Sequence, residues 1–196
     1  MFKNKPLLLG ILLFCNPPAH ADALQKVEIN PYIGPLSLVD HLLDSSSTAS
    51  LSFSYGRYDT EEKREWVFPV FWSFNNKDTD LMLEAGYRYY VAGGSPYPNG
   101  IYIGGFSRYF YSKAEVFDNS NRAFYQSANR LGLGLEAGLN FFFYKNYYWS
   151  INIKYGRYFA GDLDGNPAID RYILPPYDSG DTIFDFTLLH VGMAFY

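Results

Sequence analysis

The feature that most constrains the fold is a two-residue alternation, which is clearest in residues 130–140, RLGLGLEAGLN. Leucine or alanine occupies every odd position from Leu131 to Leu139, and the even positions carry three glycines, Glu136 and Asn140. Successive side chains of a β-strand point to opposite faces. The segment therefore predicts a strand with one apolar face and one face of small or polar residues.

The same alternation returns along the chain, and turn-forming residues separate the alternating segments. We predict eight strands, over 26–39, 48–58, 65–74, 79–91, 100–114, 129–143, 147–160 and 183–196. A short helical turn over 35–43 is an alternative to continuing the first strand. No long segment shows helical periodicity and no linker interrupts the pattern, so we expect one all-β domain.

The start of the chain resembles a secretory signal peptide. A basic beginning and an apolar run precede the small residues of AHA, which suit a cleavage site. We predict a cleavable signal peptide over 1–21 and a mature β-barrel domain over 22–196. Cys15 raises the alternative of a lipoprotein signal, but the bulky Phe14 directly before it disfavours that processing.

Charge and cysteine content narrow the class of protein. The one cysteine lies in the predicted signal, and a mature domain without disulfides suits a bacterial envelope protein. The formal net charge is −4, and loss of the two signal lysines makes it −4 − 2 = −6. An acidic chain without a basic stripe excludes nucleic acid as an expected partner. No mature segment is long and apolar enough for a transmembrane helix.

Alternation alone also fits a soluble secreted barrel such as a lipocalin, so the class of protein depends on which face of the sheet contacts water. The rows opposite the apolar residues are mostly Gly, Ser and Asn, which suit a crowded barrel interior. Aromatic residues make up 20% of the chain, and they gather near strand ends, where a membrane barrel carries its aromatic girdles. The examples are Trp66, Trp72–Phe74, Tyr87–Tyr90, Tyr109–Tyr111, Phe141–Tyr144, Tyr147–Trp149 and Tyr158–Phe159. We therefore predict that the apolar side faces lipid, which requires a closed sheet.

With its signal, eight alternating segments, aromatic girdles and terminal VGMAFY, the sequence resembles the small eight-stranded outer-membrane barrels of the OmpA/OmpX-type superfamily. The resemblance implies an antiparallel up-and-down transmembrane β-barrel in the outer membrane of a Gram-negative bacterium. It also implies that Phe195 and Tyr196 form the insertion signal for the barrel-assembly machinery. Both termini would face the periplasm, which places 40–47, 75–78, 115–128 and 161–182 outside the cell. The last two would be the longest connections.

Charged residues on the predicted interior face suggest an ion-pair network. Glu84, Arg108, Glu136 and Lys154 lie near the middle of four consecutive strands and alternate in sign, and Arg88 lies close to Glu84. A charge inside a narrow barrel is costly unless it is paired. We expect these five residues to pair with one another and close the lumen, with a narrow or gated ion path as the alternative.

Residues for catalysis or metal binding are few. His41 lies beside acidic and hydroxyl residues in a predicted outer loop, and His190 lies in the last strand, but neither belongs to a recognisable nucleophile motif. Five aspartates in 161–182 do not follow the spacing of a calcium loop and suit turns better. We predict no catalytic, cofactor-binding or metal-binding residues.

The sequence therefore favours a structural or adhesion-like role at the cell surface. We expect contacts with outer-membrane lipid and lipopolysaccharide, and with a surface partner through 115–128 and 161–182. A lipid A-modifying barrel enzyme is the alternative from a different class, and a soluble ligand-binding barrel is the third.

Overall fold

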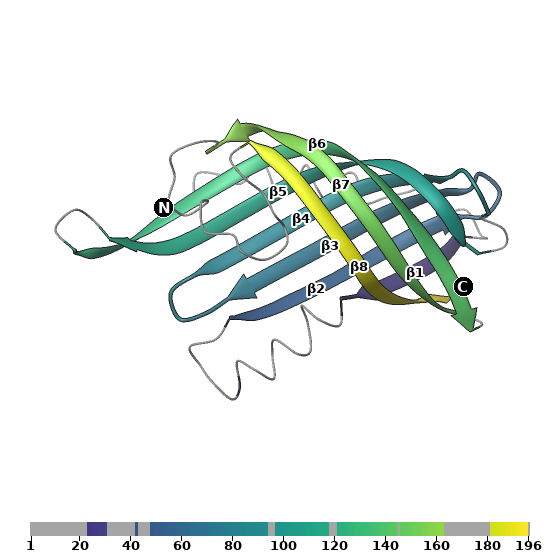
Figure 1. Cartoon of the computed structure of the whole chain (residues 1–196), viewed down its shortest axis with the longest axis horizontal. Helices are drawn as coiled ribbons and strands as arrows, with labels where there is room; N and C mark the ends of the chain where they lie inside the picture. Colours follow the sequence, from purple (N-terminus) through teal and green to yellow (C-terminus); the bar gives the residue numbers. More distant parts are fainter. Residues whose placement is uncertain are drawn as a thin grey trace.

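The computed structural model describes residues 23–30, 42, 48–93, 97–117, 121–144, 146–162 and 181–195, and these residues form eight strands (Figure 1). The strands are β1 (Ala23–Ile29), β2 (Ala49–Asp59), β3 (Arg64–Phe74), β4 (Thr79–Tyr90), β5 (Gly100–Phe117), β6 (Ala123–Tyr144), β7 (Tyr147–Gly161) and β8 (Thr182–Phe195). The predicted signal peptide, 1–21, lies outside the described residues and stays a prediction.

Each strand pairs antiparallel with the next along the chain, and β8 pairs with β1, so the sheet closes into a barrel. Lys26 of β1 lies opposite Gly56 on one side and Ala194 on the other. The prediction of an all-β, eight-stranded, up-and-down barrel is confirmed. Among the described residues, no helix has the length and apolar character needed to cross a membrane.

The two faces of the barrel wall differ in polarity, and the polar face is the inner one. Leu135 is 74% exposed, whereas the next residue, Glu136, is 4% exposed. Trp66 and Phe53 are likewise exposed on the outside, while Glu65 and Ser54 next to them are buried. The predicted assignment of the leucine side to the exterior and the glycine and glutamate side to the interior is confirmed.

The barrel has two rims, and we name one of them the terminal rim because the first strand begins there and the last strand ends there. The terminal rim carries the start of β1 and the end of β8 together with the 60–63, 91–99 and 145–146 connections. The distal rim carries the connections 30–48, 75–78, 118–122 and 162–181. In Figure 1 the terminal rim is at the right, and the hairpin of β5 and β6 extends past the other strands at the left.

The first strand differs from the predicted 26–39 in its described part. It begins at Ala23 and ends at Ile29, and residues 31–39 lie outside the described part of the chain. Pro31 has no N–H group to donate to the ladder, which disfavours one continuous strand over 26–39. Of the suggested helical turn over 35–43, only Leu42 is among the described residues.

The prediction that residues 115–128 form an outer loop was wrong. This segment is largely strand, since β5 and β6 stay paired from Gly100↔Asn140 through Phe117↔Ala123. The hairpin continues because its inner side chains stay packed beyond the last pair with β4: Val116 is buried, and Ala114 packs on Ala128. The connection that remains between these strands is only 118–122.

A bulge in β8 changes which of its residues face inward. Ser150 pairs with His190 and Asn152 pairs with Thr187, so β8 carries one more residue than β7 across this interval. Asp185 on one side of the bulge and Ala194 on the other are both buried, although one number is odd and the other even. A strict two-residue period would have placed them on opposite faces.

Candidate functional site

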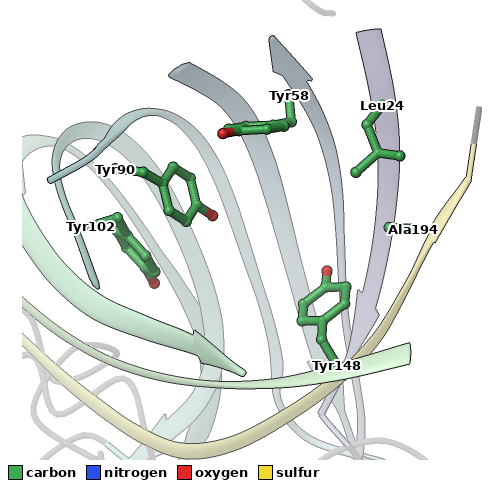
Figure 2. Close-up of a cluster of buried hydrophobic side chains, with 6 residues drawn as sticks. All are labelled: Leu24, Tyr58, Tyr90, Tyr102, Tyr148 and Ala194. Carbon is green, nitrogen blue, oxygen red and sulfur yellow. The ribbon is translucent and has the colours of Figure 1, made fainter. Parts of the chain in front are cut away.

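A layer of aromatic side chains fills the barrel near the terminal rim. We call it the tyrosine layer: Leu24, Tyr58, Tyr90, Tyr102, Tyr148 and Ala194, all at most 1% exposed. Figure 2 shows these side chains projecting from the barrel wall into the space that the strands enclose. The ring of Tyr90 packs edge-on against Tyr58, at 5.3 Å between centroids, and lies 5.5 Å from Tyr102.

Several residues of the predicted aromatic girdle lie inside the barrel instead of on its outer face. Tyr90, Phe110, Tyr148 and Tyr158 belong to the predicted girdle segments but are buried inside the barrel. The physical reason is the alternation itself, since consecutive aromatic residues of one strand project to opposite faces.

Interior glycines make room for these rings. A Cβ atom on Gly138 would lie 2.4 Å from the Tyr102 hydroxyl, and one on Gly192 would lie 2.4 Å from the Tyr148 ring. Both distances are too short for any real contact. The glycine rows therefore accommodate aromatic rings as much as charged side chains.

Four charged side chains form a chain of ion pairs across the middle of the barrel, which we call the Glu84 cluster. Glu84 of β4 accepts a hydrogen bond from Arg108 Nε of β5 at 2.6 Å, and its other oxygen pairs with Lys154 of β7. Arg108 also pairs with Asp185 of β8. Two positive and two negative charges thus balance within side chains that are at most 10% exposed.

A second set, the Glu136 cluster, lies between the Glu84 cluster and the tyrosine layer. Arg88 binds Glu136 through two hydrogen bonds, Nε–Oε1 at 2.9 Å and Nη2–Oε2 at 3.1 Å. Lys26 Nζ lies 2.7 Å from Glu65 Oε1 and 3.4 Å from Glu28 Oε1. All five side chains are at most 4% exposed.

The Glu136 cluster and the tyrosine layer are bound to each other. The Arg88 guanidinium lies 4.5 Å from the centre of the Tyr102 ring, which is cation–π distance. The Tyr90 hydroxyl donates to Glu65 at 2.7 Å, and the Tyr148 hydroxyl donates to Glu28 at 2.9 Å. Charges and rings therefore hold one another in fixed positions.

The structure places all five residues of the predicted network in the interior. Some of them pair with a residue of the neighbouring strand, and others pair with a residue of a more distant strand. Glu84 and Arg108 pair across neighbouring strands. Glu136 stands in register with Lys154 on the next strand, yet its ion pair is with Arg88, two strands away. Lys154 pairs across the lumen with Glu84.

Four network residues were missed by the sequence reasoning: Lys26, Glu28, Glu65 and Asp185. A signal for three of them was present, because Lys26, Glu28 and Glu65 alternate with outward apolar residues. Asp185 was assignable only once the bulge of β8 was known.

A small cavity remains beside the clusters, with a volume of about 60 Å³. It has room for a few water molecules. Ser54, Asn152 and His190 line it, and each has a polar atom without a hydrogen-bond partner among the described residues. His190 Nδ1 lies 3.7 Å from Glu28 Oε2.

Of Phe195, Tyr196 and His41, which the sequence also singled out, one is in the described structure and two lie outside it. Phe195 ends β8, where it lies opposite Gln25, and Tyr196 is outside the described residues. His41 is also outside them. No group of three or more potential His, Cys, Asp or Glu metal ligands occurs in the described part of the chain.

The described residues thus define a closed, antiparallel, eight-stranded β-barrel with an ion-paired interior and an apolar exterior, an arrangement of polarity that is typical of transmembrane β-barrels. Among solved structures, the chain is similar to the N-terminal β-barrel domain of Pseudomonas aeruginosa OprF, with 14% identity, a TM-score of 0.43, and coverage of 89% of this chain and 98% of the other. It is also similar to Neisserial surface protein A (NspA), with 12% identity, a TM-score of 0.43, and coverage of 89% and 96%. No family model matches the chain, and neither does any curated protein.

Proposed function

We propose that this protein is an integral barrel of the Gram-negative outer membrane, with a closed interior and a structural or surface-interaction role exerted beyond its distal rim. The observation that carries this proposal is the reversed polarity of the wall. Leu135 is exposed and Glu136 beside it is buried and ion-paired. Exposed apolar rows all round a barrel suit acyl chains and would aggregate in water.

The closed interior is supported by the side chains that cross it. The tyrosine layer occupies the terminal rim, and the Glu136 and Glu84 clusters follow it. Further along, the apolar side chains of Phe71, Phe106, Phe110, Tyr158 and others pack together. Buried ion pairs resist separation because a charge that loses its partner stays desolvated. This interior is expected to transmit little or no ion current.

The surface role is supported by the β5–β6 hairpin. The pairing between β4 and β5 ends with Thr79 opposite Lys113. The hairpin continues four residues further, to Phe117, which is about 13 Å of extended chain. Phe117 is 58% exposed and Tyr125 is 56% exposed on the same outward face. Lys77 pairs with Glu115 at 2.9 Å and supports the base of the hairpin. We propose that this hairpin, with the connection 161–182, contacts lipopolysaccharide or a surface partner.

The membrane placement has a direct test. The protein is expressed with its full N-terminus, and the cell envelope is separated into inner and outer membranes. We expect the protein in the outer-membrane fraction, with faster electrophoretic migration before boiling than after it. Recovery in the soluble periplasmic fraction would refute the proposal.

A narrow pore is a second candidate, and the cavity beside Asn152 and His190 is the observation that favours it. Conductance in planar bilayers separates the two. A closed interior predicts a baseline indistinguishable from bilayers with a heat-denatured sample, whereas regular discrete steps would support the pore.

The position of His190 does not support the lipid-modifying alternative. Such an enzyme needs a base close to a hydroxyl and an acid at the outer edge of the bilayer. His190 instead lies inside the barrel beside Glu28, with Tyr148 of the tyrosine layer on the same carboxylate. Lipid A profiles with and without expression of the protein test this alternative, and we expect them to be identical.

A further inference from the structure

The exterior of the barrel carries a hollow over strands β4 to β7. Its volume is about 650 Å³, and its lining includes Tyr87, Ile103, Gly105, Ala137 and Tyr155. The hollow lies within the apolar exterior, since Ile103 is 52% exposed and Tyr155 is 63% exposed. Under the proposed function, this apolar exterior lies inside the bilayer, where a soluble partner has no access to the hollow.

Gly105 lines the hollow, and the packing of the barrel wall does not require glycine at this position. A Cβ atom at Gly105 would contact only the Gly134 carbonyl oxygen, at 3.6 Å, which is an ordinary van der Waals distance. By contrast, Cβ atoms at Gly104 and Gly134 would lie within 2.6 Å of backbone atoms. Packing of the wall therefore requires glycine at those positions but not at Gly105.

A protruding side chain, Leu135, forms part of the wall of the hollow. Leu135 is the most exposed large apolar side chain on the described strands, at 74%, and it lies opposite Gly105 in the β5–β6 register. Adjacent strands are about 4.8 Å apart and tilt about 40° in a small barrel, so paired residues differ in height by about 3 Å. A leucine side chain spans that difference.

A projection and a hollow at nearly the same height satisfy the geometry of a two-fold dimer. In such a dimer the axis is parallel to the membrane normal, and residue i of one copy meets residue j of the other while j meets i. We propose that the Gly105 hollow receives Leu135 of a second copy of this chain, and that the contact is reciprocal. This inference rests on the proposed membrane placement.

A second copy suits the hollow better than an acyl chain does. Lipid already solvates apolar surface, so association in a bilayer depends on close packing and hydrogen bonds, and small residues such as Gly105 and Ala137 permit close approach. The lining of the hollow is almost wholly apolar, so the contact with a second copy is expected to depend on this close packing alone.

Photo-crosslinking in intact outer membranes tests the proposal, because a benzophenone side chain reacts with C–H bonds of protein and lipid alike. Leu135→p-benzoylphenylalanine is expected to give a dimer adduct whose crosslink maps to residues 103–107 of the other copy. Phe53→p-benzoylphenylalanine, on the exposed face of β2, is the matched control and is expected to give lipid adducts.

A second substitution tests the hollow itself. Gly105→Leu adds side-chain atoms on the outer face of the wall, where its Cβ atom meets only an ordinary contact, and it is expected to lower the dimer adduct about tenfold, the effect of overpacking a contact. Heat-modifiable migration of each variant reports folding and membrane placement separately from dimer formation. Lipid adducts alone at position 135, a crosslink that maps elsewhere, or an adduct unchanged by Gly105→Leu would each overturn the dimer and leave the proposed function standing.

Discussion

Glu136→Gln is the substitution that best tests the account of the barrel interior. It preserves the shape of the side chain and removes its charge, so the outer face of the wall is unchanged. Glu136 binds Arg88 through two hydrogen bonds, at 2.9 and 3.1 Å. The amide of glutamine keeps one acceptor and turns the other contact into a donor facing a donor.

Two effects oppose each other in this variant. The Glu136 cluster holds three carboxylates and two cations, Lys26 and Arg88, so a count of charges alone predicts that removing one carboxylate stabilises the barrel. Geometry predicts the reverse, since the remaining acidic contact of Arg88, with Glu65, is 3.7 Å long. Arg88 is 2% exposed and cannot recover its hydration. Removal of one partner from a buried pair costs about 3–5 kcal/mol, and this term dominates.

The assay is urea unfolding of the barrel in phospholipid vesicles, followed by tryptophan fluorescence. We expect Glu136→Gln to lower the free energy of unfolding by about 3 kcal/mol, the low end of that range because the side chain keeps its shape. The matched control is Glu62→Gln, which breaks an exposed pair with Arg64 and should cost about 0–1 kcal/mol.

Equal free energies of unfolding for the two variants would refute the argument. They would mean that water or a shift of Arg88 satisfies the guanidinium, and that the buried pair contributes no more than a surface contact. The refutation would be sharper if Glu136→Gln stabilised the barrel, because the charge count would then outweigh the geometry.

Three further predictions follow from the interior and the distal rim. Gly192→Ala places a Cβ atom 2.4 Å from a buried tyrosine ring and should lower the free energy of unfolding by about 1–3 kcal/mol, while Gly105→Ala, which meets only an ordinary contact, should change it by less than about 0.5 kcal/mol. Tyr102→Ala removes a ring from the tyrosine layer, so bilayer conductance should rise above the wild-type baseline; an unchanged baseline would show that the layer does not limit conductance. At the distal rim, the hydrogen bond from Arg157 lowers the pKa of Asp181 below its ordinary value of 3.8. This contact is therefore present at neutral pH and is lost as the pH falls through the lowered pKa, and Arg157→Gln should raise the titration midpoint of the Asp181 carboxyl in NMR spectra.

Sequence reasoning reached the architecture because strand alternation is a local property. Which face Leu135 or Glu136 occupies depends only on a two-residue period, and the period is readable from neighbours. The same logic would have revealed Glu65, which sits between outward-facing residues of β3. Eight such segments predicted the closed barrel, since a lipid-facing sheet cannot leave an open edge.

The partners inside the barrel were not readable in the same way. Arg88 reaches Glu136 two strands away, and Lys154 reaches Glu84 across the lumen. Such pairings depend on curvature and on the stagger of the strands, which sum over the whole sheet. The bulge of β8 shifts Asp185 relative to His190, and it is visible only in the pairing with β7.

The amino-acid sequence by itself determined the two faces of the wall, the number of strands and the polar character of the interior, because each of these follows from contacts between near neighbours. Only the tertiary structure decided which charges meet, which tyrosines pack together near the terminal rim, how far the β5–β6 hairpin extends and that Gly105 and Leu135 line one hollow. Those features arise from residues far apart in the chain, which closure of the barrel brings together.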